Sequence, residues 1–178
     1  MNLSTTPIAV ASALDQLPWF AVQTRSHFEK VVLGELDKRG IDAFLPVRRV
    51  VRSWSDRKKL IEEPLFRGYV FLRASIENRL RALQAPGVVR YVGGSAQSPW
   101  EVPEPEMAAL RRFVEEDIRV DPYPYLRAGQ LVRVRNGPLR GLQGFIVHKP
   151  RFCRLVISVE MMMQSVAVEI DEALVEAL

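Results

Sequence analysis

The sequence predicts an α+β protein in which an N-terminal αβ sandwich domain precedes a small C-terminal β-barrel. Apolar residues at helical spacing alternate with runs of strand formers through most of the chain, whereas only short strand-type runs follow a proline-rich stretch at residues 121–125. The 178 residues are 48% hydrophobic and 26% charged, with a net charge of +4. This ordinary composition excludes a wholly disordered chain, a fibre and a coiled-coil rod.

The first folded element is a strand at residues 19–24, after a leader (residues 1–18) that we expect to be disordered. A helix follows, because Ser26 stands three residues before Glu29, the spacing of a capping box. Gly40 ends this helix, since glycine readily adopts the left-handed conformation of a C-terminal stop. The predicted inward face consists of Phe28, Val32 and Leu36.

The middle of the chain continues the alternation. Strand formers occupy residues 41–47, 65–72 and 88–92, and the second of these runs gives the strongest strand signal. Two further helices are indicated by apolar residues on one face, the second over residues 104–116 with prolines near its start. Their predicted inward residues are Ile76, Leu80 and Leu83 in the first, and Met107, Leu110 and Val114 in the second.

Composition changes at Asp117, which divides the chain. We predict a linker over residues 117–127, because closely spaced prolines remove backbone donors and restrict the residues before them. An N-terminal domain over residues 19–116 and a barrel over residues 128–178 follow from this boundary. The predicted barrel strands are residues 131–135, 144–148, 155–159 and 166–170.

The sequence lacks the usual signatures of an enzyme active site and of a metal site. Cys153 is the single cysteine, His27 and His148 lack evident partners, and no glycine-rich phosphate loop ending in Lys-Ser/Thr occurs. We therefore predict a protein that is not an enzyme and uses neither a cofactor nor a metal ion. No apolar run approaches the roughly 20 residues that span a bilayer, so the expected location is the cytoplasm.

Basic residues gather between residues 48 and 59, where only Asp56 opposes them. If this stretch links two antiparallel strands, it forms a basic arm with Trp54 near its tip, suited to phosphate contact and base stacking. The alternative is a solvated loop whose tryptophan packs on the body. The predicted nucleic-acid contacts are Arg48, Arg49, Arg52, Trp54, Arg57, Lys58 and Lys59.

Phe66 and Tyr69 lie on opposite faces of the strongest predicted strand. Core packing is the default for both aromatic rings. Gly68 between them weakens a strand interior, and such a glycine often marks a close backbone approach. A groove for an apolar partner is therefore the alternative interpretation of this segment.

Four blocks of the chain resemble the NusG family of transcription elongation factors, in the order found in that family. The blocks run from Trp19 to Glu29, from Glu63 to Phe71, from Pro86 to Gly94 and from Gly129 to Gly144, and the last resembles a KOW motif. The resemblance covers about residues 19–178. It implies an N-terminal domain of the NGN type, a flexible linker and an SH3-like KOW barrel.

The resemblance also implies partners. In this family the N-terminal domain docks through an apolar cavity on the clamp helices of the largest RNA polymerase subunit, suppresses pausing and lies near the non-template DNA strand. By motif match, Phe66 and Tyr69 would line this cavity, with Trp19 and Val92 close by, and Gly68 would let the backbone approach. Nascent RNA is a second candidate nucleic acid, and the resemblance implies a monomer without membrane contact.

Two departures from the family pattern bear on function. Arg67 stands where the family signature has proline, and residues 63–66 are closer to specialised paralogues, such as RfaH and the capsule-operon regulators, than to housekeeping NusG. Met161, Met162 and Met163 replace an exposed aromatic residue with which housekeeping NusG contacts Rho or a ribosomal protein. The methionines form either an adaptable apolar contact or part of a strand-end core. These departures favour an operon-specific antitermination factor.

Some specialised relatives hold the C-terminal module as a helical hairpin. β-Branched residues are frequent between residues 155 and 170, so we predict that this module rests as strands. Two other functions stay open. One is a general NusG-type factor in elongation and Rho-dependent termination, and the other is a ribosome-associated KOW protein that binds structured RNA.

Overall fold

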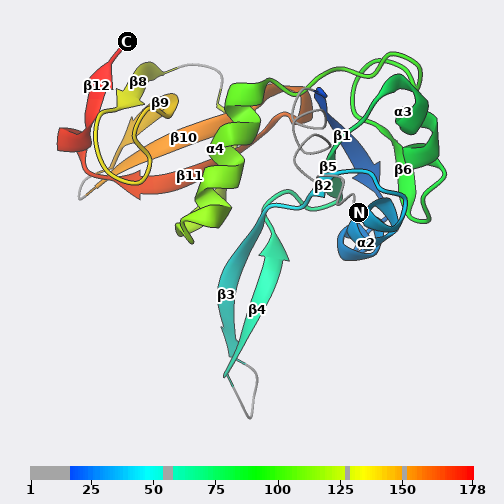
Figure 1. Cartoon of the computed structure of the whole chain (residues 1–178). Helices are drawn as coiled ribbons and strands as arrows, with labels where there is room; N and C mark the ends of the chain where they lie inside the picture. The colour runs from blue at the N-terminus through cyan, green and yellow to red at the C-terminus, as the bar shows by residue number, and fades with distance from the viewer. Residues whose placement is uncertain (1–16, 54–57, 127–128, 150–151) are drawn as a thin grey trace, which may run out of the picture. The chain divides into compact units, whose positions relative to one another are not determined.

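The chain folds into two compact units (Figure 1). Among the described residues, unit 1 comprises residues 17–44 together with Gly68–Glu101, and unit 2 comprises those of Leu45–Arg67 together with Val102–Leu178. The segment predicted as an N-terminal domain, residues 19–116, therefore contributes to both units. The computed structural model describes residues 17–53, 58–126, 129–149 and 152–178.

Unit 1 contains a four-stranded antiparallel sheet in the order β2-β5-β1-β6. Strand β1 has four apolar residues followed by glutamine and threonine, and its Phe20 and Val22 are among the most buried residues. The elements of unit 1 are β1 (Trp19–Thr24), α2 (Glu29–Lys38), β2 (Ala43–Phe44), β5 (Tyr69–Arg73), α3 (Ile76–Leu83) and β6 (Val88–Tyr91).

Helix α2 forms as predicted, but its N-terminus differs from the predicted capping box. His27 has a positive φ of 62°, and the N-cap is Phe28, which makes no side-chain cap bond. The Glu29 carboxylate instead accepts a hydrogen bond from the Gly68 N–H, so the reciprocal pairing with Ser26 is wrong. Of the predicted inward face, Val32 and Leu36 are buried and Phe28 is exposed. Gly40 ends the helix with a φ of 67°, as predicted.

Helix α3 buries a different face from the one predicted. Ile76 is 76% exposed and Leu80 is 55% exposed, whereas Ala82 is buried. Periodicity identified an amphipathic helix correctly, but Ala82 is its buried residue, and of the predicted inward residues Leu83 is half-buried. Ser75 caps the helix by accepting a hydrogen bond from the Asn78 N–H over 3.3 Å.

The predicted strand over residues 65–72 is not one strand. The chain leaves β4 at Pro64, and β5 begins only at Tyr69. Gly68 lies between them with a φ of 81°, a left-handed conformation that interrupts a ladder and that glycine adopts without steric cost. Similarly, the predicted strand over residues 41–47 is divided into β2 and the start of β3, with Pro46 at the break.

Unit 2 contains a six-stranded antiparallel sheet in the order β12-β8-β9-β10-β11-β7, a separate β3-β4 hairpin and helix α4. The four predicted C-terminal strands are all present within two residues of their expected bounds. The elements are β3 (Val47–Ser53), β4 (Lys58–Pro64), α4 (Glu104–Glu115), β7 (Val120–Tyr123), β8 (Gln130–Val134), β9 (Gln143–His148), β10 (Cys153–Val159), η1 (Glu160–Met162), β11 (Gln164–Ile170), η2 (Glu172–Leu174) and β12 (Val175–Ala177).

Strand β7 lies inside the segment predicted as a linker. Val120 pairs with Val168 and Tyr123 pairs with Ser165, so the proline-rich segment extends the sheet beside β11. Pro122 is tolerated because β7 is an edge strand, where one side of the backbone needs no ladder partner. The prolines correctly excluded a helix, but they did not exclude an edge strand.

Helix α4 packs against β10. Met107 and Leu110 are buried as predicted, and Phe113 is buried in place of Val114. Residues 155–170 form β10 and β11 joined by η1, so this segment is in the strand form that its β-branched residues favour. Within the described residues, no helix is long and apolar enough to cross a membrane.

Candidate functional site

The basic stretch folds as an antiparallel hairpin, β3 and β4 (Figure 1). Val47 pairs with Pro64 at the base, and Ser53 pairs with Lys58 at the last described pair before the tip. Trp54 and Arg57, predicted near the tip, lie outside the described residues. The strands required by the predicted basic arm are therefore present.

The register divides the hairpin's side chains between two faces, because directly opposite residues of an antiparallel pair point to the same side. One face carries the pairs Arg48–Glu63, Val50–Ile61 and Arg52–Lys59, and the other carries Arg49–Glu62, Val51–Leu60 and Ser53–Lys58. On both faces the acidic residue lies at the base, and the lysine lies toward the tip. The hairpin therefore has a charge gradient along its length.

Glu63 binds the arginines of its own face. Arg52 Nε donates to Glu63 Oε1 over 2.9 Å, and Arg48 Nη2 lies 3.4 Å from Glu63 Oε2. The hydrogen bond from Arg52, with the positive charges of both arginines, lowers the pKa of Glu63 below its ordinary value of 4.5. The Glu63 carboxylate is thus held in its ionised form and offsets the arginine charge at the base.

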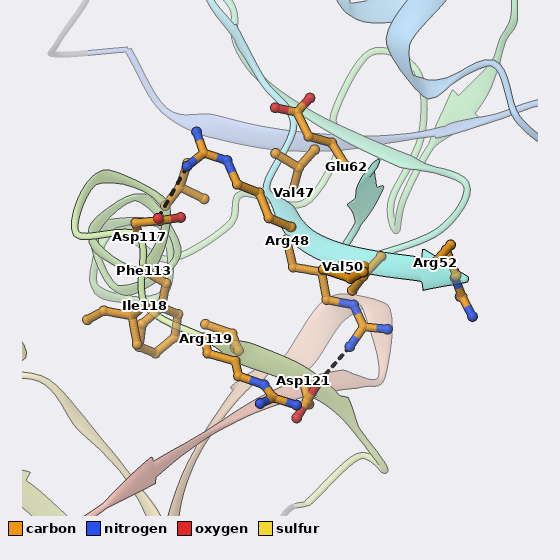
Figure 2. Close-up of a pocket in the computed structure, with 14 residues that line it drawn as sticks. Val47, Arg48, Val50, Arg52, Glu62, Phe113, Asp117, Ile118, Arg119 and Asp121 are labelled. Atoms are coloured by element: carbon orange, nitrogen blue, oxygen red, sulfur yellow. Dashed lines mark hydrogen bonds and ion pairs between the residues drawn. The ribbon is translucent and has the colours of Figure 1, made fainter. Parts of the chain in front are cut away.

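Arg48 also binds the neighbouring strand β7. Its Nη1 donates to Asp121 Oδ1 over 2.6 Å, as Figure 2 shows. With two acidic partners and a half-buried side chain, Arg48 joins β3 to β7 within unit 2. Both of its guanidinium contacts face protein carboxylates, so this residue has less capacity for phosphate than the sequence suggested.

Arg49 is held more loosely than Arg48. Its Nη1 lies 3.2 Å from Asp117 Oδ2, but the two side chains are 58% and 73% exposed. Exposed ion pairs of this kind contribute little free energy, about 0–1 kcal/mol. A phosphate can therefore replace the Asp117 carboxylate at low cost.

A groove of about 720 Å³ separates β3 from the segment that follows α4 (Figure 2). Its apolar lining includes Val50, Phe113 and Ile118, and arginines and acids form its edges. Two carboxylates at this groove form ion pairs with arginines, Asp117 with Arg49 and Asp121 with Arg48. The groove therefore combines apolar lining residues with charged edges, at which Arg48 and Arg49 are paired.

Lys58 and Lys59, unlike the described arginines of the hairpin, form no ion pair with a carboxylate of the described residues. Both side chains are exposed, and neither forms an ion pair with any residue in the described part of the chain. Lys59 lies directly opposite Arg52, but the Glu63 carboxylate binds Arg52 and not Lys59. The unpaired positive charge of the hairpin is thus concentrated toward its tip.

The residues predicted to dock a protein partner fall mainly in unit 1. Tyr69 lies opposite Gln23, which lies opposite Arg90 on the next strand, so the three side chains form a row on one face of the sheet. Arg90 Nε donates to Gln23 Oε1 over 2.9 Å. Tyr69 and Val92 are half-buried. Motif matching did not single out Gln23 and Arg90, although sheet register places them beside Tyr69.

Trp19 is a core residue of unit 1 and not part of an open surface. Its ring packs edge-on against Phe44 with centroids 6.4 Å apart, and the Arg73 guanidinium lies 4.8 Å from its ring centroid. Only 2% of the residue is exposed. Trp19 therefore offers no open surface to a partner.

Gly68 is explained by conformation and not by a close approach. A Cβ on Gly68 would meet no atom within 4 Å, but its φ is 81°. Its N–H donates to the buried Glu29 carboxylate over 2.7 Å, and its carbonyl accepts from the Thr24 N–H over 2.8 Å. Glu29 thus stabilises the turn before Tyr69, whereas the sequence pattern predicted that Glu29 caps a helix.

The remaining predicted site residues differ in accessibility. Phe66 is only 1% exposed and therefore offers no ring surface in this structure. Met162 is buried at the end of η1, Met161 is half-buried, and Met163 is 54% exposed in a left-handed conformation with a φ of 53°. Met162 thus fits the predicted strand-end core, and Met163 is at the surface, where the alternative, an apolar contact with a partner, would require it.

The family to which the chain belongs is identified by a match to its sequence. Residues 17–111, more than half of the chain, match the family described as "Transcription termination factor nusG". The chain belongs to the NusG family, as its four sequence blocks predicted. Proteins of this family are transcription factors and not enzymes.

Similar curated proteins extend over most of the chain. The transcription termination/antitermination protein NusG of Neisseria meningitidis is 29% identical over 172 residues, covering 89% of this chain and 96% of that protein. The Pseudomonas aeruginosa protein of the same name is 27% identical over 172 residues, covering 89% and 97%. The structure of Thermotoga maritima NusG shares the fold, with a TM-score of 0.55, 20% identity and coverage of 93% of this chain and 99% of that one.

Proposed function

We propose that this chain is an elongation factor that binds RNA polymerase through unit 1 and presents the tip of its β3-β4 hairpin to nucleic acid. Bound in this way, it suppresses pausing and promotes processive elongation or antitermination at particular operons. Family membership supports the class of function. The observation that carries the proposal is the charge distribution of the hairpin, in which Arg48 and Arg52 are paired with acidic residues and Lys58 and Lys59 are not.

The polymerase contact is assigned to Tyr69 and its neighbours. Tyr69 and Val92 are half-buried, so part of each apolar side chain remains available to a partner. An amphipathic helix such as the polymerase clamp helices binds by laying its apolar face on such a surface. Gln23 and Arg90, in the same row as Tyr69, supply polar contacts at its edge. Trp19 and Phe66 are buried and contribute no direct contact in this structure.

The nucleic-acid contact is assigned to the hairpin tip. Lys58 and Lys59 project to opposite faces, as their pairing partners Ser53 and Arg52 require. A flexible single strand can contact both faces, whereas a rigid duplex favours one. Non-template DNA and nascent RNA are both single-stranded near the polymerase and are the proposed ligands.

A binding assay with purified RNA polymerase tests the docking surface. Tyr69→Ala removes a partly exposed aromatic ring, and we expect it to weaken binding to an elongation complex by about tenfold or more, as loss of an aromatic anchor does. Asp37→Ala on α2 is the matched control, because Asp37 is exposed on another element of the same unit. Unchanged affinity of a folded Tyr69→Ala chain would refute the assignment.

A general role in Rho-dependent termination is the second candidate, because the relatives carry the name termination/antitermination protein. In place of the family's loop aromatic, this chain offers Met163 as its exposed residue. We expect no stimulation of Rho at a Rho-dependent terminator. If the wild-type chain stimulates Rho and Met163→Ala abolishes this stimulation, the chain has the general role and not the operon-specific one. A ribosomal protein is the other proposed partner of this surface.

A further inference from the structure

Three potential metal ligands meet at one end of the six-stranded sheet. His148 is the last residue of β9, Cys153 is the first residue of β10, and the two are paired across the strands. Cys153 also pairs with Ile170, the last residue of β11, and Glu172 begins η2 two residues later. The backbone of the sheet therefore brings together an imidazole, a thiol and a carboxylate that are distant in sequence.

The ligand atoms are close enough to share one ion. Cys153 Sγ lies 3.3 Å from His148 Nδ1 and 3.8 Å from Glu172 Oε2, and the latter two atoms lie 3.8 Å apart. Zinc bonds of about 2.3 Å to sulfur and about 2.0–2.2 Å to nitrogen and oxygen, in tetrahedral geometry, require ligand separations of about 3.4–3.6 Å. The observed separations differ from these values by only a few tenths of an ångström.

We propose that His148, Cys153 and Glu172 form a binding site for one Zn²⁺ ion. A thiolate, an imidazole and a carboxylate are the ligand types that zinc prefers, whereas Mg²⁺ and Ca²⁺ favour sites built from oxygen alone. The chain supplies three ligands, and a water molecule completes the tetrahedron. Binding replaces the thiol proton by the metal, so one proton is released from Cys153 as the ion enters.

The surroundings favour a cation. A hollow of about 670 Å³ opens over the three residues, and the acidic residues Glu169 and Asp171 line it as well. Apart from the proposed ligand His148, Lys149 is the one basic residue among its lining residues in the described part of the chain. The Asp171 carboxylate accepts a hydrogen bond from the Ala173 N–H over 3.0 Å, which orders the start of η2 where Glu172 stands.

Carboxylates surround the Cys153 thiol. Burial and the negative charges of Glu172 and Asp171 raise the pKa of Cys153 above its ordinary value of 9.0. These same carboxylates, unfavourable to a bare thiolate, become favourable once a divalent ion lies between them and the sulfur. Cys153 is also buried, so the ion reaches it through the more exposed His148 and Glu172.

Cobalt substitution on the full-length chain tests the proposal, because Co²⁺ bound by a thiolate gives a charge-transfer band in the near ultraviolet. We expect this band to appear in the reduced, metal-stripped chain, to saturate at one ion per chain and to disappear when Zn²⁺ is added. His148→Asn and Glu172→Gln alter exposed side chains, and each is expected to weaken Zn²⁺ binding by about tenfold or more in competition with a chromogenic chelator.

Glu169→Gln is the matched control, because it removes a charge from the same hollow without removing a ligand. It is expected to retain Zn²⁺ affinity within about threefold, an electrostatic effect smaller than the loss of a ligand. Absence of the cobalt band would overturn the proposal, and so would equal losses in Glu169→Gln and Glu172→Gln. Cys153→Ser should abolish the band. If that variant fails to fold, the Zn²⁺ affinities of His148→Asn and Glu172→Gln, which alter exposed side chains, still decide the test.

Discussion

Lys58 and Lys59 should account for the salt dependence of nucleic-acid binding by the hairpin. They are exposed and have no ion pair among the described residues, whereas Arg48 and Arg52 are bound by acidic side chains. A cation that contacts phosphate releases condensed counterions, and each contact with a single strand contributes about −0.7 to the slope of log K against log salt. Lys58→Ala combined with Lys59→Ala should therefore reduce the steepness of that slope by about 1.4.

The expected effect is large enough to measure. Between about 50 mM and 200 mM salt, a slope difference of about 1.4 corresponds to about sevenfold in affinity, so the wild-type chain should lose about seven times more affinity than the double variant. Fluorescence anisotropy with a labelled single-stranded oligonucleotide gives both slopes directly. Tyr69 lies in unit 1, outside the hairpin, so polymerase binding at constant salt serves as a check on folding.

Two variants separate the hairpin tip from other sources of charge. Lys38→Ala removes an exposed lysine from α2 and should leave the slope unchanged, because Lys38 already pairs with Glu35 over 2.8 Å. Arg48→Ala should lower the stability of the fold more than it lowers the slope, because Arg48 joins Glu63 and Asp121. Equal slopes in the wild type and in the double lysine variant would refute the assignment of phosphate contact to the tip.

Three further predictions concern the fold. Glu29→Ala leaves the Gly68 N–H without its acceptor and should cost about 1–3 kcal/mol of unfolding free energy in a urea titration; an unchanged midpoint would contradict the role given to Glu29. Burial and the nearby Glu160 carboxylate raise the pKa of Glu106 to about 7, so the folded chain holds this proton more tightly than the unfolded chain and stability should fall as pH rises from about 4.5 to 7. Glu106→Gln should remove that fall, by about 1–2 kcal/mol after solvent screening, in thermal unfolding across this pH range. Gly93→Ala should lower the melting temperature, because φ is 70° there and a Cβ would collide with the Trp100 ring; a wild-type melting temperature would show that the turn adjusts freely.

Local patterns in the sequence were sufficient for most of the secondary structure. The spacing of Val32 and Leu36 identified α2, and runs of β-branched residues identified β10 and β11, because these signals depend only on neighbouring residues. The failures occurred where a distant contact decided the outcome. Glu29 appeared to cap a helix, but Gly68, which is 39 residues away in sequence, supplies its hydrogen bond.

The candidate nucleic-acid site was predicted in part. Charge clustering identified the hairpin, and its register, once known, placed Glu63 opposite Arg48. No local signal showed that Asp121 would pair with Arg48, because β7 reaches its position only when it joins the edge of the six-stranded sheet. The burial of Phe66 likewise depends on packing and not on the residues beside it.

The amino-acid sequence alone determined the family, the α+β class and the concentration of positive charge between residues 48 and 59, since ordered motifs and composition exist before folding. Only the tertiary structure decided which of those charges remain unpaired and that His148, Cys153 and Glu172 lie together. The physical reason is that ion pairs and metal ligation act across a few ångströms of space, and strand pairing brings residues to that distance regardless of their separation along the chain.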